Sequence, residues 1–99
     1  MAEVVTGGDV RSGEPRIEGT RVTVLDVKRR VLDAGEDPHV VASEYDLPGG
    51  GLFRALAYYH DNREEFRRLE EEHAAARAAG ERATRESLAE VAGAEEPPD

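Results

Sequence analysis

The chain has 99 residues, a formal net charge of −9 and no cysteine. This length allows one small domain, and the missing cysteine excludes a disulfide scaffold, a thiolate metal site and a cysteine nucleophile. The negative charge opposes binding to nucleic acids and membrane surfaces at ordinary ionic strength. The sequence has no apolar run long enough for a transmembrane helix and no signal-peptide pattern at its start, so we expect a soluble, cytoplasmic protein.

The acidic composition has two explanations that the sequence leaves open. Twelve of the 13 basic residues are arginine, and Lys28 is the single lysine. A GC-rich genome is one explanation, and adaptation to a salt-loaded, halophilic cytoplasm is the other, which we favour. At molar salt the Debye length is about 3 Å, so the net charge would then say little about DNA binding.

Two short extended segments are expected near the N-terminus, at residues 3–5 and 15–17. Turn-forming residues separate them, which predicts a small hairpin or arm that is too small to fold alone. Gly19-Thr20-Arg21 then turns the chain toward the first helix. We expect Arg21 to tie the arm to a carboxylate or a carbonyl, with a contact to phosphate as the alternative.

The first helix is predicted to begin after Thr23, a candidate N-cap. Asp26 follows three residues later, as in a capping box. Gly35 is expected to end the helix in the left-handed conformation. The apolar stripe of this helix is predicted to contain Val24, Val27, Val31 and Leu32, with Leu25 beside it.

Residues 38–56 match the pattern of a helix-turn-helix. Asp37-Pro38 is a helix start signal, and a third helix is expected over residues 52–60. Ala42 is small enough for two helices to cross closely, and Asp46 tolerates a left-handed conformation in the turn between them. The alternative is a plain helical core with no DNA role, because other three-helix packings also meet this pattern.

A local basic group in this acidic chain predicts a nucleic-acid surface. Its side chains are candidates for contacts with phosphates and base edges. Three glycines at residues 49–51 argue against base reading, since each costs about 1 kcal/mol relative to alanine in the first turn of a recognition helix. The candidate DNA-binding residues are Arg16, Arg21, Lys28, Arg29, Arg30, Arg54, Tyr58 and His60.

A highly charged helix is expected from about residue 63 to 79. Asp61-Asn62 is its candidate cap, Gly80 is expected to break it, and Thr84 to cap a further short helix. The fold class is therefore mainly α, with a three-helix helix-turn-helix core, a short N-terminal β arm and a long charged C-terminal helix. We expect the arm and core over residues 1–62, the charged helical extension over 63–92 and a disordered tail over 93–99.

The polar residues do not form a recognisable catalytic pattern. His39, His60 and His73 are spread over three segments, which makes a metal site improbable. The glutamates at 64–65 and 70–72 alternate with arginines, as on a solvated helix face. No phosphate-binding glycine loop is present. We therefore expect no enzymatic activity, no metal and no cofactor.

Several motifs occur in an order that is similar to one known family. They are Gly13, Pro15, Ile17, Gly19-Thr20-Arg21-Val22 and Val24, then Ala34-Gly35-Glu36, Asp37-Pro38 and Tyr45-Asp46-Leu47, and last Ala55-Leu56-Ala57-Tyr58-Tyr59. Together they resemble the small prokaryotic domain-of-unknown-function family 433 over about residues 4–66. The resemblance implies a winged or homeodomain-type helix-turn-helix protein of the VapB antitoxin type, which silences a PIN-like ribonuclease toxin and represses its own operon.

The resemblance also implies a use for the C-terminal extension. PIN-type nucleases hold their metal with clustered carboxylates, and inhibitors of such sites commonly insert a basic side chain. A weakly helical segment with interspersed arginines can fold on a partner, whereas a solvated helix with no partner is the alternative. The candidate toxin-binding residues are Arg77, Arg82, Arg85, Leu88 and Val91.

The leading hypothesis is a non-catalytic, antitoxin-like regulator that binds a PIN-like toxin, with operator DNA as a second candidate partner. The alternative is a protein–protein interaction or adaptor module without DNA binding. A small core with an open β edge also suggests a homodimer formed through the arm or the charged helix.

Overall fold

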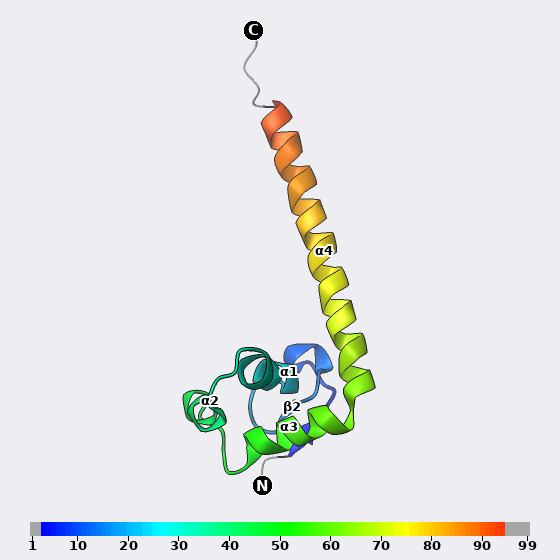
Figure 1. Ribbon diagram of the computed structural model, residues 1–99. Helices are drawn as coiled ribbons and strands as arrows, with labels where there is room; N and C mark the ends of the chain where they lie inside the picture. Colours follow the sequence, from blue (N-terminus) through cyan, green and yellow to red (C-terminus); the bar gives the residue numbers. More distant parts are fainter. Residues whose placement is uncertain (1–2, 95–99) are drawn as a thin grey trace. The chain divides into compact units, whose positions relative to one another are not determined.

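The computed structural model describes residues 3–94 (Figure 1). Within this range the chain is mainly helical, with four α-helices and one two-stranded sheet. The chain divides into two units, Met1–Phe66 and Arg67–Asp99. The architecture confirms the predicted mainly α class with a short N-terminal β arm and a long C-terminal helix.

The arm is a hairpin of β1 (Val4–Val5) and β2 (Arg16–Ile17). The strands are antiparallel, and Val4 lies opposite Ile17. The N–H of Ile17 also donates to the Val22 carbonyl over 2.9 Å, which holds β2 to the segment that precedes the first helix. Strands this short are not stable alone, so the fully buried Ile17 side chain anchors the arm to the core.

Helix α1 (Val24–Lys28) starts at the predicted capping box. The Thr23 hydroxyl accepts from the Asp26 N–H over 3.1 Å, and the Asp26 carboxylate accepts from the Thr23 N–H over 3.0 Å. The chain continues as a π-helical turn, η2 (Arg29–Asp33), and Gly35 follows with a φ of 70°. Both the start and the left-handed end of this helix are as predicted.

The apolar stripe of the first helix is shorter than predicted. Val24, Leu25 and Val27 are buried, whereas Leu32 is 42% exposed. A π-helical turn is wider than an α-helical turn, so the residues after Lys28 no longer follow the 3.6-residue period that predicted the stripe. Leu32 was therefore wrongly included, and Leu25 belongs to the core itself.

Helices α2 (Pro38–Glu44) and α3 (Gly51–Asp61) form the helix-turn-helix. Asp37 caps α2, because its carboxylate accepts from the His39 N–H over 2.8 Å. Asp46 has a φ of 53°, which is the left-handed turn conformation that the sequence predicted. The glycine run lies mostly before α3, since Gly50 is its N-cap and only Gly51 is helical.

The hydrophobic core lies entirely in the first unit. Helix α1 packs against α3, and α3 contacts both strands of the arm. The Val24 N–H at the start of α1 donates to the Pro15 carbonyl over 2.9 Å. The ring of Phe66 lies 5.5 Å from that of Tyr59 between centroids and closes this core at its C-terminal end. The buried apolar side chains in the described range are Pro15, Ile17, Val24, Leu25, Val27, Val41, Leu52, Ala55, Tyr59 and Phe66.

Helix α4 (Arg63–Ala94) passes through Gly80 without interruption. The predicted break at Gly80 and the cap at Thr84 are therefore wrong. A glycine inside a helix costs only about 1 kcal/mol relative to alanine, and the neighbouring alanine, arginine and glutamate residues favour helix continuation. The side chain of Asn62, predicted to cap this helix, instead donates to the Tyr58 carbonyl over 2.9 Å.

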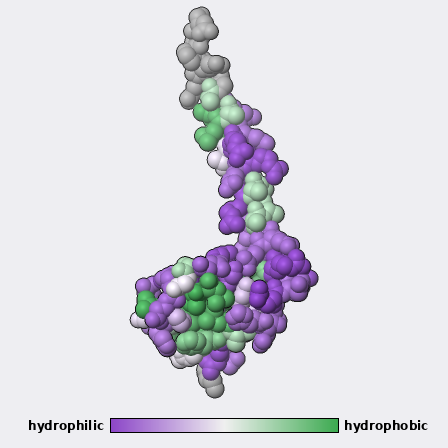
Figure 2. All heavy atoms as spheres, viewed as in Figure 1, coloured by the Kyte–Doolittle hydropathy of each residue, from purple (hydrophilic) through white to green (hydrophobic). Residues whose placement is uncertain are grey.

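Along the second unit, hydrophilic surface alternates with hydrophobic patches (Figure 2). From Arg67 to Ala92 no side chain is buried, and Leu88 and Val91 are 63% and 52% exposed. Among the described residues, no helix is both long and apolar enough to cross a membrane. The proposed disordered tail overlaps α4 at residues 93–94, and its remaining residues, 95–99, lie outside the described range.

Candidate functional site

Arg11 connects the arm to α1. Its guanidinium donates to the Asp26 carboxylate, with Nη1 2.8 Å from Oδ2 and Nη2 3.3 Å from Oδ1, and Nη1 also donates to the Arg21 carbonyl over 2.9 Å. Burial of Asp26 opposes its ionisation, but hydrogen bonds from Arg11 and from the Thr23 N–H outweigh burial, and the pKa of Asp26 is lowered. The side-chain contact that was predicted to join Arg21 to a carboxylate is thus made by Arg11. Arg21 contributes only its main-chain carbonyl to this contact.

Arg30 is paired with two acidic residues. Its guanidinium donates to both carboxylate oxygens of Glu36, over 2.9 Å and 2.6 Å, and also to the Glu44 carboxylate. It lies 5.1 Å from the centre of the Tyr45 ring. The hydrogen bond from Arg30 lowers the pKa of Glu36. This candidate DNA contact therefore joins η2 to α2, and its charge is balanced within the chain.

Lys28 is also engaged within the first unit. Its Nζ lies 2.9 Å from an oxygen of the Asp33 carboxylate and 5.8 Å from the centre of the Tyr59 ring. Of the other candidates in this segment, Arg16 is half-buried, and Arg21 and Arg29 are exposed. Of this basic group, Lys28 and Arg30 are thus paired with acidic residues of the same unit.

The third group of DNA candidates lies on α3. Arg54 and Tyr58 line a hollow of about 250 Å³ with Glu3, Val4, Ala57 and Asp61. The Tyr58 hydroxyl donates to Glu65 over 3.5 Å, and burial, followed by the charge of Glu65, raises the pKa of Tyr58. His60 is exposed, with its ring 5.4 Å from that of Tyr59. Two carboxylates thus line the same hollow as the candidate cation Arg54.

The outer surface of the helix-turn-helix is partly apolar. Phe53 on α3 is 46% exposed, and Val40 on α2 is 49% exposed. The rings of Phe53 and His39 lie 5.5 Å apart between centroids, which links the two helices. Such a surface is suited to contact with a protein more than to contact with phosphates.

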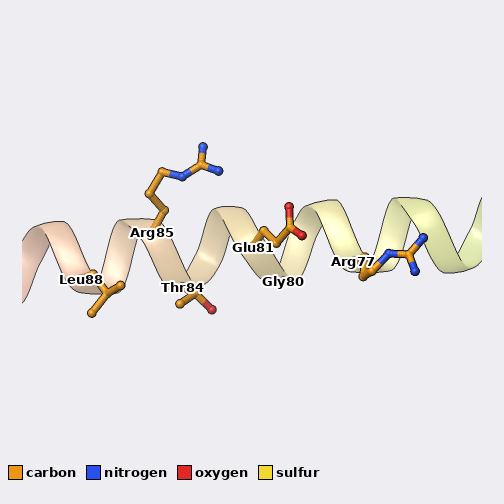
Figure 3. Close-up of a pocket in the computed structure, with 6 residues that line it drawn as sticks. All are labelled: Arg77, Gly80, Glu81, Thr84, Arg85 and Leu88. Carbon is orange, nitrogen blue, oxygen red and sulfur yellow. The ribbon is translucent and has the colours of Figure 1, made fainter.

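Several of the candidate toxin contacts line a shallow depression along α4 (Figure 3). Arg77, Arg85 and Leu88 line it together with Gly80, Glu81 and Thr84. Val91 follows Leu88 by three residues and therefore lies on the same side. Arg82 does not line the depression, because 100° of rotation per residue carries it to the other side of the helix.

The sequence did not predict the ion pairs between residues that are distant in the chain. Arg11 and Asp26 are separated by 15 residues, and Arg30 and Glu44 by 14. No local pattern marks either pair. The exposed side chains of Phe53 and Val40 were also missed, since a helical apolar residue usually belongs to a core.

No group of three or more histidine or acidic side chains with the geometry to hold a metal ion occurs in the part of the chain that the structure describes. The fold and surfaces define a small helix-turn-helix protein with a β arm and an exposed charged helix. Residues 4–59 match the family model described as "Protein of unknown function (DUF433)", and the chain belongs to this family. Neither curated proteins nor solved structures include a match to the chain.

Proposed function

We propose that this protein is a non-catalytic, antitoxin-like regulator that binds a PIN-like ribonuclease toxin through α4. The observation that carries the proposal is the exposure of Leu88 and Val91 on the side of α4 that also presents Arg77 and Arg85. The identity of the toxin as a PIN-like nuclease comes from the family resemblance.

This surface has the chemistry of a binding anchor. Burying Leu88 and Val91 against a partner contributes roughly 1.5–3 kcal/mol for each side chain. Arg85 precedes Leu88 by three residues, and Arg77 lies about two turns further toward the start of α4. An arginine can bind a carboxylate through two parallel hydrogen bonds. A partner with an apolar groove next to clustered carboxylates, as expected for the metal site of a PIN-like nuclease, fits both features.

The test first identifies a PIN-like nuclease in the reading frames next to this gene, then measures its affinity for the full chain by calorimetry and its ribonuclease activity by cleavage of RNA. We expect tight binding and inhibition by the native chain, and at least tenfold weaker binding by the double variant Leu88→Asp, Val91→Asp. Ala89→Asp, on the other side of the same turns, is the matched control and is expected to bind normally. Undiminished binding by the double variant, or no binding by the native chain, contradicts the proposal.

Operator DNA is a second candidate partner, supported by the α2–turn–α3 geometry with its left-handed Asp46. The intramolecular pairing of Lys28 and Arg30 makes it the weaker candidate. Fluorescence anisotropy with the DNA upstream of the gene, measured from low to molar salt, tests it. Binding that falls linearly on a log–log plot against salt, and that is weakened by Arg21→Ala, supports a DNA contact. No binding at any salt concentration favours the adaptor module.

A further inference from the structure

Gly80 lies in the middle of α4 without a role in the fold of the chain. A glycine there destabilises a helix relative to alanine. Its φ is not in the left-handed region, and a Cβ atom added at this position would have no neighbour within 4 Å. Neither backbone conformation nor a close approach within the described chain therefore requires a glycine. A helix from another molecule that crosses α4 closely at this point would require one.

The residues on the same face of α4 are arranged symmetrically about Gly80. Steps of four, seven and eleven residues return nearly to the same side of an α-helix. Four residues away lie Ala76 and Thr84, which are both small. Seven residues away are His73 and Ser87, and eleven residues away are Leu69 and Val91. Small residues thus surround the centre, polar uncharged or histidine side chains follow, and large apolar residues close both ends.

We propose that α4 pairs with α4 of a second copy of this chain in antiparallel orientation, with the two-fold axis at Gly80. This arrangement places Leu69 against the partner's Val91 and His73 against the partner's Ser87. It also brings Arg77 beside the partner's Glu81 on one flank, and the symmetry repeats each contact. A parallel pair would instead place His73 against the partner's His73. The hydrogen bond that an imidazole and the Ser87 hydroxyl can form in the antiparallel pair would then be lost.

The opposite flank limits the strength of this pairing. There the same symmetry brings Glu72 near the partner's Glu86, and these like charges repel each other. Salt screens this repulsion and the Arg77–Glu81 attraction alike, but each copy carries a net charge of −9, so the repulsion between copies is the larger effect. Self-association is therefore expected to strengthen from low to molar salt.

The self-pairing surface overlaps the surface assigned to the toxin, and this consequence rests on the proposed function. Arg77 and Thr84 lie at the crossing and also line the depression beside Leu88. One copy of α4 therefore cannot bind the second copy and the toxin at the same time. The homodimer keeps the toxin-binding surface covered until the toxin displaces the second copy.

The first experiment measures self-association of the full chain by sedimentation equilibrium over a wide range of protein concentration at molar salt. We expect a monomer–dimer equilibrium that Gly80→Leu weakens at least tenfold, because the added side chain blocks the crossing. Ala78→Leu adds the same side chain on the far side of α4 and is expected to leave the equilibrium unchanged. A monomer at every concentration, or equal association of the Gly80→Leu variant, overturns the proposal.

A smaller substitution separates packing from helix stability. Gly80→Ala is expected to increase the helix content measured by circular dichroism and at the same time to weaken the dimer. If Gly80 had no packing role, the more stable helix would leave the dimer unchanged or strengthen it. That result would overturn the role assigned to Gly80.

Orientation is tested with single spin labels, because the chain contains no native cysteine. Glu71→Cys and Ala89→Cys lie nine residues on either side of Gly80, and Ala78→Cys lies near it. An antiparallel pair predicts axial label separations of about 27 Å at the two outer positions and about 6 Å at the inner one. Equal distances at all three positions would show a parallel pair and overturn the orientation.

The two proposals fail independently. Dimerisation is measured on this chain alone, so a dimer without toxin binding leaves the pairing intact and removes the proposed function. Toxin binding by a chain that is always monomeric removes the pairing only. When both occur, titration with toxin is expected to convert the dimer to a toxin complex that contains one copy of α4 at each binding site. A toxin complex that retains the α4 pair would contradict the proposal that the toxin and the second copy compete for the same surface.

Discussion

At the scale of single residues, Arg11 and Asp26 join three parts of the first unit. Arg11 lies in η1 (Val10–Gly13), Asp26 belongs to α1, and the Arg21 carbonyl belongs to the segment between arm and helix. Asp26 serves two purposes, because it also completes the capping box with Thr23. This partly exposed ion pair therefore supports the position of the arm, together with the buried Ile17 side chain.

Replacing Arg11 tests this dependence. Arg11→Ala is expected to lower the free energy of unfolding by about 1 kcal/mol, a charged hydrogen-bond pair discounted for the exposure of Arg11. Arg21→Ala is the control and should have little effect, because Arg21 contributes its carbonyl and not its guanidinium. Urea unfolding at neutral pH measures both. A larger loss for Arg21→Ala than for Arg11→Ala would contradict the assignment.

Asp26 also predicts a dependence of stability on pH. Its pKa is lowered in the folded chain from its usual value of 3.8, so the folded state favours the ionised carboxylate. This contribution is present above the pKa of the unfolded chain, about 3.9, and is lost as the pH falls through the lower folded pKa. Asp26→Asn should therefore be less stable than the native chain at pH 7, and the difference should shrink toward pH 2. A difference that does not change with pH would exclude this contribution.

At the scale of elements, local signals account for the helix starts and the turn of the helix-turn-helix. Thr23 caps α1 and Asp37 caps α2 through hydrogen bonds between residues two or three apart. The turn depends on Asp46 in the left-handed region. A side chain in this conformation costs energy that glycine avoids.

The left-handed conformation of Asp46 predicts opposite changes in stability for two substitutions at this position. Asp46→Gly is expected to maintain or raise the melting temperature, since glycine adopts this φ without strain. Asp46→Val is expected to lower the free energy of unfolding by about 1–2 kcal/mol, because a β-branched residue is strained there. Thermal unfolding followed by circular dichroism compares the two. Equal melting temperatures for these variants would show that the turn conformation contributes little.

At the scale of the whole molecule, the buried core and the exposed helix have different roles. All side chains buried in the described part of the chain precede Arg67. The second unit presents charged and small residues along α4, with Leu88 and Val91 exposed. The first unit thus supplies the buried core, and the partner surfaces proposed for this chain lie on the second.

A truncated chain tests this division. Ending the chain after Glu72 removes most of the second unit and keeps the turn of α4 that follows Phe66. We expect cooperative unfolding at a melting temperature close to that of the full chain, together with loss of toxin binding. Calorimetry measures the transition, and the Ala78→Leu variant of the full chain, which is altered on the far side of α4, serves as a comparison with an intact second unit. A truncated chain without a cooperative transition would show that the first unit depends on the second.

The sequence alone determined the elements whose signals lie within a few residues, namely the capping box, the Asp37-Pro38 start and the left-handed Asp46. It also determined where the core lies, because few large apolar residues follow Phe66. Only the tertiary structure decided that Arg11 pairs with Asp26 and that Arg30 joins Glu36 to Glu44, since folding brings distant residues together. The structure also showed that α4 continues through Gly80. The helix propensity of many neighbouring residues outweighs the small cost of one glycine inside a helix.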